Sequence, residues 1–273
     1  PHLWLGTSSF SENSWVGPFY PRGTKPGDYL RHYATRFDTV EIDATYYAIP
    51  SARTVDGWSA KTPDDFVFAA KFPRSIVHCG EGPRPRGDLV LTPRTYPDRD
   101  AFLNVMGRLG GKLGPLLIQF PYFNKQAFAD RREFVERLDT FLDELSTDFR
   151  YAVEIRNRAW LQPDFMETLS RHNCALTLLD QAWMPHGAEF AEQIDPITTD
   201  FSYVRLIGDR AEIEAITETW DKVVIDRGES IDRWAELLKT IMRRDINVFA
   251  YINNHYAGHA PVTCEQLAET LAG

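Results

Sequence analysis

Eight short apolar runs recur along the chain at intervals of roughly 25 to 50 residues, and helix-like amphipathic segments separate most of them. Eight alternating strand and helix units within 273 residues predict an α/β fold, a (β/α)₈ TIM barrel. In that fold the active site lies at the carboxyl ends of the strands, where most of these runs end in a polar residue. The predicted strands are Leu3–Ser8, Thr39–Tyr46, Phe66–Lys71, Gly114–Phe120, Tyr151–Arg156, Ala175–Asp180, Tyr203–Gly208 and Asn247–Asn254.

Helical periodicity is clearest in the second half of the chain. Asp130–Leu145 and Glu229–Met242 carry apolar residues at helical spacing, and Pro163 occupies a first-turn position before another apolar stripe. Gln181–Asp200 shows no good helical pattern, so we expect it to be irregular. The other predicted helices cover Pro26–Phe37, the segment from the candidate cap Ser51 to Trp58, Asp100–Leu109 and Glu265–Leu271.

Composition predicts one globular domain over residues 1–273, because 43% hydrophobic and 25% charged residues are ordinary values. The longest apolar run, Leu113–Phe120, is far shorter than a membrane span, and no charged-then-apolar leader precedes the first strand. Cys79, Cys174 and Cys264 are an odd set at wide spacing, which favours reduced thiols over a disulfide framework. We therefore expect a cytoplasmic protein without a membrane partner. The chain begins at Pro1 without Met, so we also expect residues upstream.

The charge of the chain is uneven. Its net charge is −9 with a pI near 5.3, which argues against general binding to nucleic acid. The segment from Lys71 to Lys112, however, has eight basic and four acidic side chains, a net +4 that leaves −13 for the remainder. This segment is interpreted either as a solvated loop or as an electropositive lip that attracts an anionic substrate to the barrel mouth.

Strand alternation assigns the charged residues of the runs to the inside of the barrel. Val40 and Ile42 should face the helices, which places Glu41 and Asp43 on the barrel axis. Asp180 is a further candidate, although the run before it is apolar on both faces. The residues expected at the mouth are Glu41, Asp43, Glu154, Lys71, Arg156, Arg205, Gln119, Asn253 and His255.

Two interpretations fit this set of charges. Charges inside a barrel are unfavourable unless they are paired, so the first is a network of salt bridges that joins Glu41 to Lys71 and Glu154 to Arg205. The second is that Lys71, Arg156 and Arg205 clamp a phosphate or carboxylate, with Arg giving bidentate contacts. Both can hold, since a substrate can replace part of the network.

The functional interpretation assigns acid–base catalysis to Glu154, Glu41 or Asp43, because burial and neighbouring charges can tune a carboxyl pKa for proton transfer. The ligand would be a small anionic or phosphorylated molecule held by the three cations. The polar residues expected to bind or orient it are Tyr46, Gln119, Asn253, Asn254 and His255.

Signals for a metal or an organic cofactor are weak. His255 and His259 are four residues apart, but in a Gly-containing loop rather than on a helix. There is no P-loop, nucleophile elbow or dinucleotide fingerprint, so nucleoside triphosphate and hydride chemistry are not expected. No cofactor is predicted, although the carboxylates together with His255 could hold a single divalent metal ion.

Short motifs in a fixed order give the chain a family resemblance. It resembles the YecE-like family, a domain of unknown function with a TIM-barrel fold. The motifs that carry the resemblance are Gly6-Thr7-Ser8, Phe19-Tyr20-Pro21, Thr39-Val40-Glu41-Ile42-Asp43, Tyr46-Tyr47, Pro50, Trp58, Thr62-Pro63, Phe66, Lys71-Phe72-Pro73, Ile76, His78, Leu113-Gly114-Pro115, Gln119-Phe120-Pro121, Val153-Glu154-Ile155-Arg156, Trp160, Tyr203-Val204-Arg205-Leu206, Asn253-Asn254, Gly258 and Ala260.

The resemblance implies the barrel but no activity, because the family has no settled function. Its fold is similar to endonuclease IV-like and xylose isomerase-like barrels, which suggests nucleic acid or sugar chemistry by analogy alone. If the histidines common in the family transfer protons or bind metal, this chain is expected to bind a different ligand or to have lost activity. It departs from the usual pattern at Ser9-Phe10 for Gly-Trp, Asp43 for Asn, Asn157 for His, Ile207 for His and His255 for Asp.

The sequence therefore predicts an enzyme of hydrolase-like or isomerase-like chemistry that acts on a small anionic or phosphorylated substrate. One alternative is a protein that processes or binds nucleic acid through the basic segment between Lys71 and Lys112. Another alternative is a ligand-binding protein without catalysis.

Overall fold

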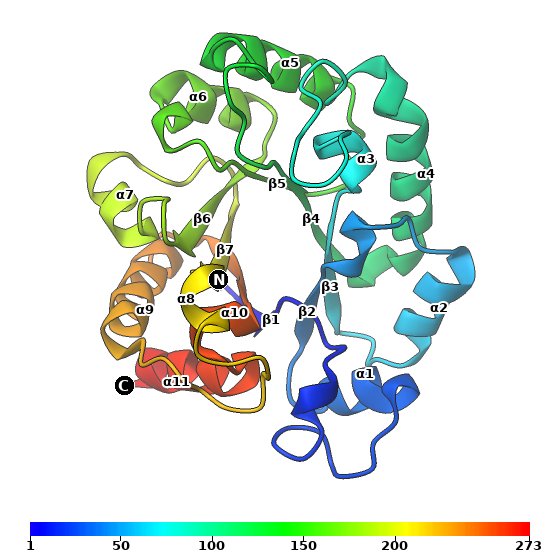
Figure 1. The fold of residues 1–273 in the computed structure, drawn as a ribbon, viewed down its shortest axis with the longest axis vertical. Coiled ribbons are helices and arrows are strands. Elements are labelled where there is room, and N and C mark those ends of the chain that lie inside the picture. The colour runs from blue at the N-terminus through cyan, green and yellow to red at the C-terminus, as the bar shows by residue number, and fades with distance from the viewer.

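The computed structural model describes residues 1–273 and confirms the barrel (Figure 1). Eight parallel strands form one sheet in the order β1-β8-β7-β6-β5-β4-β3-β2. All eight predicted strands are present, with shifts of a few residues at their ends. They are β1 (Leu3–Thr7), β2 (Thr39–Ile42), β3 (Val67–Lys71), β4 (Leu113–Gln119), β5 (Tyr151–Glu154), β6 (Ala175–Gln181), β7 (Phe201–Gly208) and β8 (Asn247–Ile252).

A tyrosine side chain completes the barrel between β1 and β2, where no ladder of backbone hydrogen bonds is formed. The Tyr33 hydroxyl accepts a hydrogen bond from the Thr7 N–H at 2.9 Å and donates one to the Thr39 carbonyl at 3.0 Å. The strands approach closely at Gly6, where an added Cβ would lie 2.3 Å from the Thr39 oxygen. A residue without a side chain is therefore needed at this seam.

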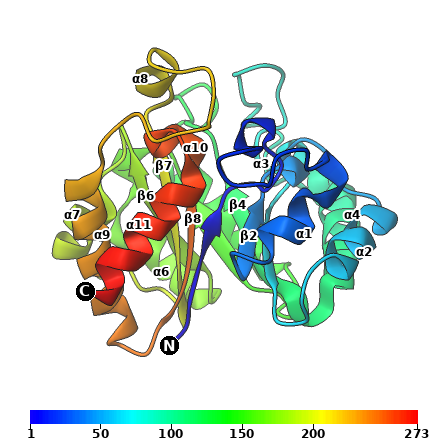
Figure 2. The same ribbon diagram turned by 90° about the horizontal axis from the view of Figure 1, so that it is seen from below.

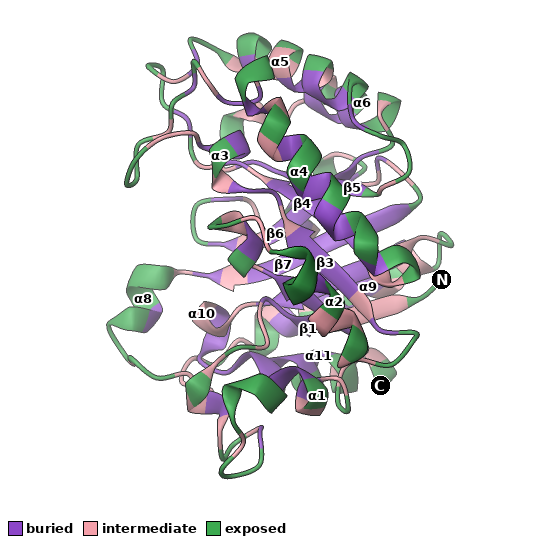
Figure 3. Cartoon of the chain, turned by 90° about the vertical axis from the view of Figure 1, so that its right-hand side faces the viewer, coloured by how far each residue is buried: buried purple, intermediate pink, exposed green.

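Helices surround the barrel and turn their exposed sides outward (Figures 1 and 3). The α-helices are α1 (Tyr29–Tyr33), α2 (Ala52–Ala60), α3 (Arg74–Val77), α4 (Tyr96–Met106), α5 (Arg131–Asp143), α6 (Pro163–Arg171), α7 (Gly187–Gln193), α8 (Arg210–Glu214), α9 (Gly228–Met242), α10 (Asn254–Ala257) and α11 (Ala260–Ala272). The 3₁₀ helices are η1 (Asn13–Trp15), η2 (Pro26–Asp28), η3 (Ala44–Tyr46), η4 (Pro93–Thr95), η5 (Gly107–Lys112) and η6 (Arg158–Trp160). None of these helices combines the length and the apolar character that a membrane-spanning helix requires.

Predicted helix starts agree with the structure where the sequence carries a recognisable capping or first-turn residue. The Ser51 side chain accepts the Thr54 N–H at the start of α2. Asp130 caps α5 by accepting the N–H groups of Arg132 and Glu133. Pro163 is the first residue of α6, as predicted.

The expectation of an irregular segment between β6 and β7 is wrong, because α7 lies within it. This helix has only seven residues, and its cap is the ring of His186, which accepts the Ala188 N–H. The usual Ser, Thr, Asp or Asn cap is therefore missing from the sequence pattern.

The predicted strands at β2, β5 and β8 extend two or more residues past the observed ends. β2 ends at Ile42 and is followed by η3, β5 ends at Glu154, and β8 ends at Ile252, two residues before the first residue of α10. The predicted helix over Pro26–Phe37 is a 3₁₀ turn followed by the short α1. Tyr46 and His255 are consequently carried by helical turns at the mouth and not by strands.

The interior of the barrel is filled asymmetrically. Small residues of β3, β5 and β6 face the rings of β7 and β8, and a stacked pair of Trp4 and Phe249, with ring centroids 4.4 Å apart, lies at the amino end. A separate, larger apolar core lies between the strands and the helices. Charged side chains therefore collect at the carboxyl end of the barrel, the end that carries α3, α8 and α10 in Figure 2. The interior cluster consists of Ala69, Leu117, Ala152, Ala175, Phe201, Tyr203, Phe249 and Tyr251.

Candidate functional site

Arg205 of β7 is the centre of the mouth, and it is 1% exposed. Its Nε and Nη2 donate to the two oxygens of Glu41 at 2.9 to 3.2 Å. Its Nη1 donates to Glu154 Oε2 at 2.8 Å and to Gln119 Oε1 at 3.1 Å. One guanidinium thus joins β2, β4 and β5 across the barrel, and the predicted convergence of these residues is confirmed.

Both glutamates of this centre are fully buried and receive further hydrogen bonds. The Tyr203 hydroxyl donates to Glu41 Oε2 at 2.6 Å, and the Arg156 Nε donates to Glu154 Oε1 at 2.9 Å. Burial alone would raise the pKa of Glu154, but Arg205 and Arg156 outweigh it and hold this pKa below its ordinary value. Glu154 is therefore a stable anion at neutral pH and a poor proton donor.

Lys71, the last residue of β3, has no hydrogen-bond or ion-pair partner for its ammonium group. The predicted pair with Glu41 is wrong, because Arg205 and Tyr203 occupy that carboxylate. The Thr45 hydroxyl fixes the backbone instead, accepting the Lys71 N–H at 3.1 Å and donating to its carbonyl at 2.7 Å. Burial and the charge of Arg205 lower the pKa of Lys71 to about 8.

Asp43 and Tyr46 belong to the turn after β2, Asp43 lies near Lys71, and neither side chain has a hydrogen-bond partner. Burial raises the pKa of Asp43, although Lys71 opposes the shift. Burial also raises the pKa of Tyr46, against the nearby charges of Arg74 and Arg156. A half-buried carboxyl group therefore lies near the unpaired amine, and a free phenol lies near Arg74 and Arg156.

The amide and imidazole residues predicted to orient a ligand are largely engaged with the protein. Asn253 Oδ1 caps α10 by accepting the His255 N–H, and it also contacts the His255 ring at 2.7 Å. Asn254 Oδ1 accepts hydrogen bonds from the Trp15 indole at 3.3 Å and from the Ala260 N–H at 2.9 Å. The side-chain oxygen of Gln119 accepts a hydrogen bond from Arg205, and its amide nitrogen has no partner.

Asp180 is turned away from the mouth. Its Oδ2 accepts hydrogen bonds from Ser230 at 2.5 Å, from the Trp234 indole at 2.9 Å and from the Tyr256 hydroxyl at 2.9 Å. These residues belong to α9 and α10, so Asp180 connects both helices to β6. Its candidacy as a mouth residue is a wrong prediction.

A small cavity of about 160 Å³ opens between the loops after β1 and β8. Asp43 lines it together with Ser8, Asn253 and His255. The Ser8 hydroxyl is buried and has no hydrogen-bond partner. Such an orphaned polar atom is expected to meet water or a ligand.

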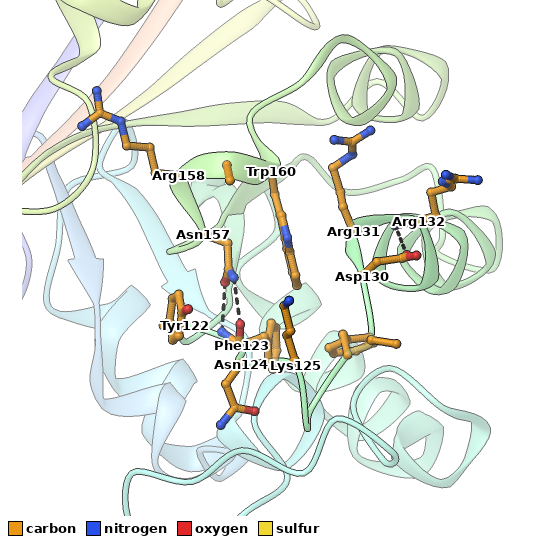
Figure 4. A pocket seen from close by; sticks show the side chains of 13 residues that line it. Tyr122, Phe123, Asn124, Lys125, Asp130, Arg131, Arg132, Asn157, Arg158 and Trp160 are labelled. Atoms are coloured by element: carbon orange, nitrogen blue, oxygen red, sulfur yellow. Dashed lines mark hydrogen bonds between the residues drawn. The ribbon is translucent and has the colours of Figure 1, made fainter.

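A second hollow of about 700 Å³ lies between the loops after β4 and β5 (Figure 4). Trp160 forms one wall, and the buried Asn157 fastens the two loops by accepting the Phe123 N–H and donating to its carbonyl. The basic side chains of this cavity that have no partner in the protein are Lys125, Arg132 and Arg158.

The basic segment from Lys71 to Lys112 does not form one continuous electropositive lip. Arg86, Arg99 and Arg108 form ion pairs with acidic side chains. Lys112 lies at the opposite end of the barrel, before β4, where its Nζ donates to backbone carbonyls. Most of the segment is helical, in α3, η4, α4 and η5, so the solvated-loop interpretation describes only the part between α3 and η4.

The residues that would bind a divalent metal ion are not assembled. No three His, Cys, Asp or Glu side chains are grouped as a metal site requires. His255 contacts Asn253 and Glu214 instead, and its ring lies 4.6 Å from that of Trp220. The proposed carboxylate and His255 ligand set is therefore not formed.

Sequence reasoning missed two residues that shape the site. Thr45 lies within a predicted strand, but its hydrogen bonds to the Lys71 backbone depend on the 3₁₀ turn after β2. Arg74, at the start of α3, places its charge near Tyr46 although it follows the strand. The Pro73 that precedes Arg74 was the available signal for a helix start at this point.

Comparison with known proteins identifies the family. A family model described as "Protein of unknown function DUF72" matches residues 4–273. The chain belongs to the DUF72 family. The resemblance predicted from the ordered motifs is thereby confirmed.

Two curated relatives of this chain are named as UPF0759 proteins. YecE of Escherichia coli (strain K12) is 35% identical over 128 residues, 47% of this chain and 41% of YecE. YunF of Bacillus subtilis (strain 168) is 30% identical over 171 residues, 62% of this chain and 56% of YunF. The chain thus spans about half the length of the curated relatives it matches.

Solved DUF72 structures share the whole fold. A member from Thermotoga maritima MSB8 has a TM-score of 0.75 at 26% identity over all of both chains. One from Enterococcus faecalis V583 has a TM-score of 0.71 at 22% identity, over 99% of this chain and 96% of that one. A family 30 glycoside hydrolase, the xylanase Xyn30A of Clostridium acetobutylicum, has a TM-score of 0.50 at 9% identity, over 99% of this chain and 71% of that one. This last likeness shows the fold alone.

Proposed function

We propose that this DUF72 protein is an enzyme that binds a small anionic substrate at the carboxyl mouth of the barrel and transfers protons on it. The observation that supports this most strongly is the unpaired ammonium group of Lys71 near the paired charges of Arg205, Glu41 and Glu154. Arg156 adds a second cation, because its Nε and Nη2 hold Glu154 while Nη1 remains without a partner. An anion between these two groups would satisfy both.

Asp43 is the acid–base group in this proposal. Its carboxyl group has no partner, its pKa is raised by burial, and it faces Lys71. A carboxyl with these properties can hold a proton closer to neutral pH than an exposed Asp can. Tyr46, whose hydroxyl is free, supplies a neutral donor to the anion.

Arg205, Glu41 and Glu154 receive a different role from the one expected of them. The guanidinium of Arg205 is already used by the two glutamates and by Gln119, so it is a positioning residue and not the anion clamp. Glu154 holds Arg156 in place toward the mouth. The proposed substrate therefore contacts the rim of the cluster and not its centre.

Anion binding can be measured directly by calorimetry with phosphate, phosphoglycolate and a set of sugar phosphates. Arg156→Met should weaken binding by about 1.5–3 kcal/mol, the scale of a hydrogen bond to a charged group. Arg108→Met is the matched control, since Arg108 also forms one carboxylate pair, with Asp56. Equal weakening in both variants, or unchanged binding in Arg156→Met, would show that the anion does not bind at the mouth.

Turnover separates an enzyme from a binding protein. A ligand found by calorimetry should be converted, and Asp43→Asn should slow its conversion while preserving binding. Binding without conversion in the parent chain would instead favour the non-catalytic alternative.

A nucleic acid is the second candidate ligand, and the cavity of Figure 4 favours it. Its unpaired Lys125, Arg132 and Arg158 adjoin Tyr122, whose side chain is 62% exposed, and Trp160. Cations beside aromatic rings are typical of surfaces that bind single strands. Binding of a labelled oligonucleotide should weaken steeply with salt and be lost in Arg132→Ala/Arg158→Ala if this candidate is right.

A further inference from the structure

The amine of Lys71 differs from that of the other half-buried lysines in having no acceptor. Lys112 Nζ donates to the Ser59 and Thr62 carbonyls at 2.9 Å, and Lys239 Nζ contacts the Thr270 carbonyl at 3.4 Å. Lys71 makes no such contact, although three carboxylates lie in the same mouth. A structural lysine would be expected to donate hydrogen bonds, because unsatisfied ammonium groups are unfavourable when desolvated.

Two of the three carboxylates in the mouth are already paired with other side chains. Arg205 and Tyr203 occupy Glu41, and Arg205 and Arg156 occupy Glu154. The groups that act on the amine are therefore Arg205 from β7, Glu41 and Asp43 from β2 and the turn after it, and Glu154 from β5. Burial and Arg205 favour the neutral amine, and the pKa falls to about 8. A fraction of the free amine is then present at neutral pH.

We propose that Lys71 is a nucleophile that forms an imine with the carbonyl group of the anionic substrate. The substrate class is a carbonyl compound with a nearby negative charge, such as a 2-keto acid or a phosphorylated aldehyde or ketone. The proposal rests on the proposed function, in which Arg156 holds the anionic group.

The chemistry balances without an oxidant or a reductant. The lone pair of Lys71 Nζ attacks the carbonyl carbon and forms a C–N bond, the C=O π pair moves to oxygen, and that oxygen takes a proton from the nitrogen. Asp43 then protonates the hydroxyl of this carbinolamine, which leaves as water while the nitrogen lone pair forms the C=N bond. The product is an iminium ion. The Asp43 carboxylate can next take a proton from the carbon adjacent to the iminium carbon, which gives an enamine.

Thr45 is the positioning residue for this nucleophile. Its hydroxyl binds both backbone groups of Lys71 and sets the direction in which the side chain leaves β3. The side chain lies near Asp43, which supplies the proton, and near Arg205. A fixed amine beside a proton donor is the arrangement that imine formation requires.

Borohydride trapping tests the proposal on the full chain. The protein is incubated with pyruvate, with glyceraldehyde 3-phosphate and with acetone, reduced with sodium borohydride, and mapped by mass spectrometry of its peptides. We expect the anionic probes to label Lys71 at least tenfold faster than the other lysines, and at least tenfold faster than acetone does. Labelling should accelerate as pH rises through about 8, the pKa of this amine.

Two variants provide controls. Lys71→Arg keeps the charge and should lose the adduct, whereas Lys112→Arg alters a half-buried lysine with full hydrogen bonding and should keep it. Peptide mapping of the parent chain decides the question even if Lys71→Arg does not fold. Labelling spread evenly over the lysines overturns the proposal. Absence of an adduct while calorimetry detects anion binding also overturns it, yet leaves the proposed function standing.

Discussion

The centre and the rim of the barrel mouth hold the same kinds of charged side chain but differ in how these are paired. At the centre, Arg205, Glu41 and Glu154 satisfy one another and are at most 1% exposed. At the rim, Lys71 and Asp43 make no side-chain hydrogen bond. Asp43 of the rim is only two residues from Glu41 of the centre along the chain.

This difference separates stability from function within one cluster. Breaking a buried, paired charge leaves its partner uncompensated, so the centre should govern folding. Groups that remain unpaired in the folded chain lose little stability when they are neutralised, and they keep the capacity to bind or react. The predictions below test that division, from the largest expected effect to the smallest.

Removal of the central cation should have the largest effect. Arg205→Met leaves Glu41 and Glu154 buried without their shared partner, and we expect the free energy of unfolding to fall by about 3–5 kcal/mol. Urea denaturation followed by tryptophan fluorescence measures this loss. A variant as stable as the parent would mean that the centre is not held by pairing.

Glu154→Gln should have an intermediate effect, about 2 kcal/mol, because it weakens hydrogen bonds to two arginines. The pKa of Glu154 is lower in the folded chain than its ordinary value of 4.5. Its contribution is therefore complete above pH 4.5 and is lost as pH falls through the folded value. Denaturation curves of parent and variant should converge in acid, and a constant difference down to pH 2 would contradict an ionic role.

Lys71→Met should change stability in the opposite direction. Because burial lowers the pKa of Lys71 from 10.5 to about 8, the folded chain resists its protonation. This penalty is complete below pH 8 and disappears as pH rises from 8 to 10.5. We expect the variant to be about 1–2 kcal/mol more stable at pH 7 and equal to the parent near pH 11. A loss of stability at pH 7 would mean that Lys71 stabilises the fold, as the residues of the centre do.

Asp43→Asn should have the smallest effect on folding, within about 0.5 kcal/mol at pH 7. The pKa of Asp43 is raised in the folded chain, so its ionised form contributes no stability there, and an amide mimics the protonated form. Imine trapping at Lys71 should nevertheless slow at least tenfold. Calorimetry of the melting transition and the trapping rate, measured on the same sample, distinguish the two effects.

The carboxyl mouth could be predicted closely because strand periodicity is a local property. Period-two alternation in Thr39–Ile42 and Phe201–Gly208 was enough to direct Glu41 and Arg205 to the same axis. The partners were not predictable in the same way. Which carboxylate a cation reaches depends on the stagger of strands around the barrel, so the expected Glu41–Lys71 pair was wrong while Glu154–Arg205 was right.

The sequence by itself determined the alternation of strands and helices, the inward faces of the strands and the ordered motifs of the DUF72 family. Those are properties of residue spacing, and spacing needs no distant contact. The tertiary structure alone decided that Arg205 takes both glutamates and that Lys71 is left free. Competition for a carboxylate is settled by distances between strands that are far apart in the chain, and only the closed barrel fixes those distances.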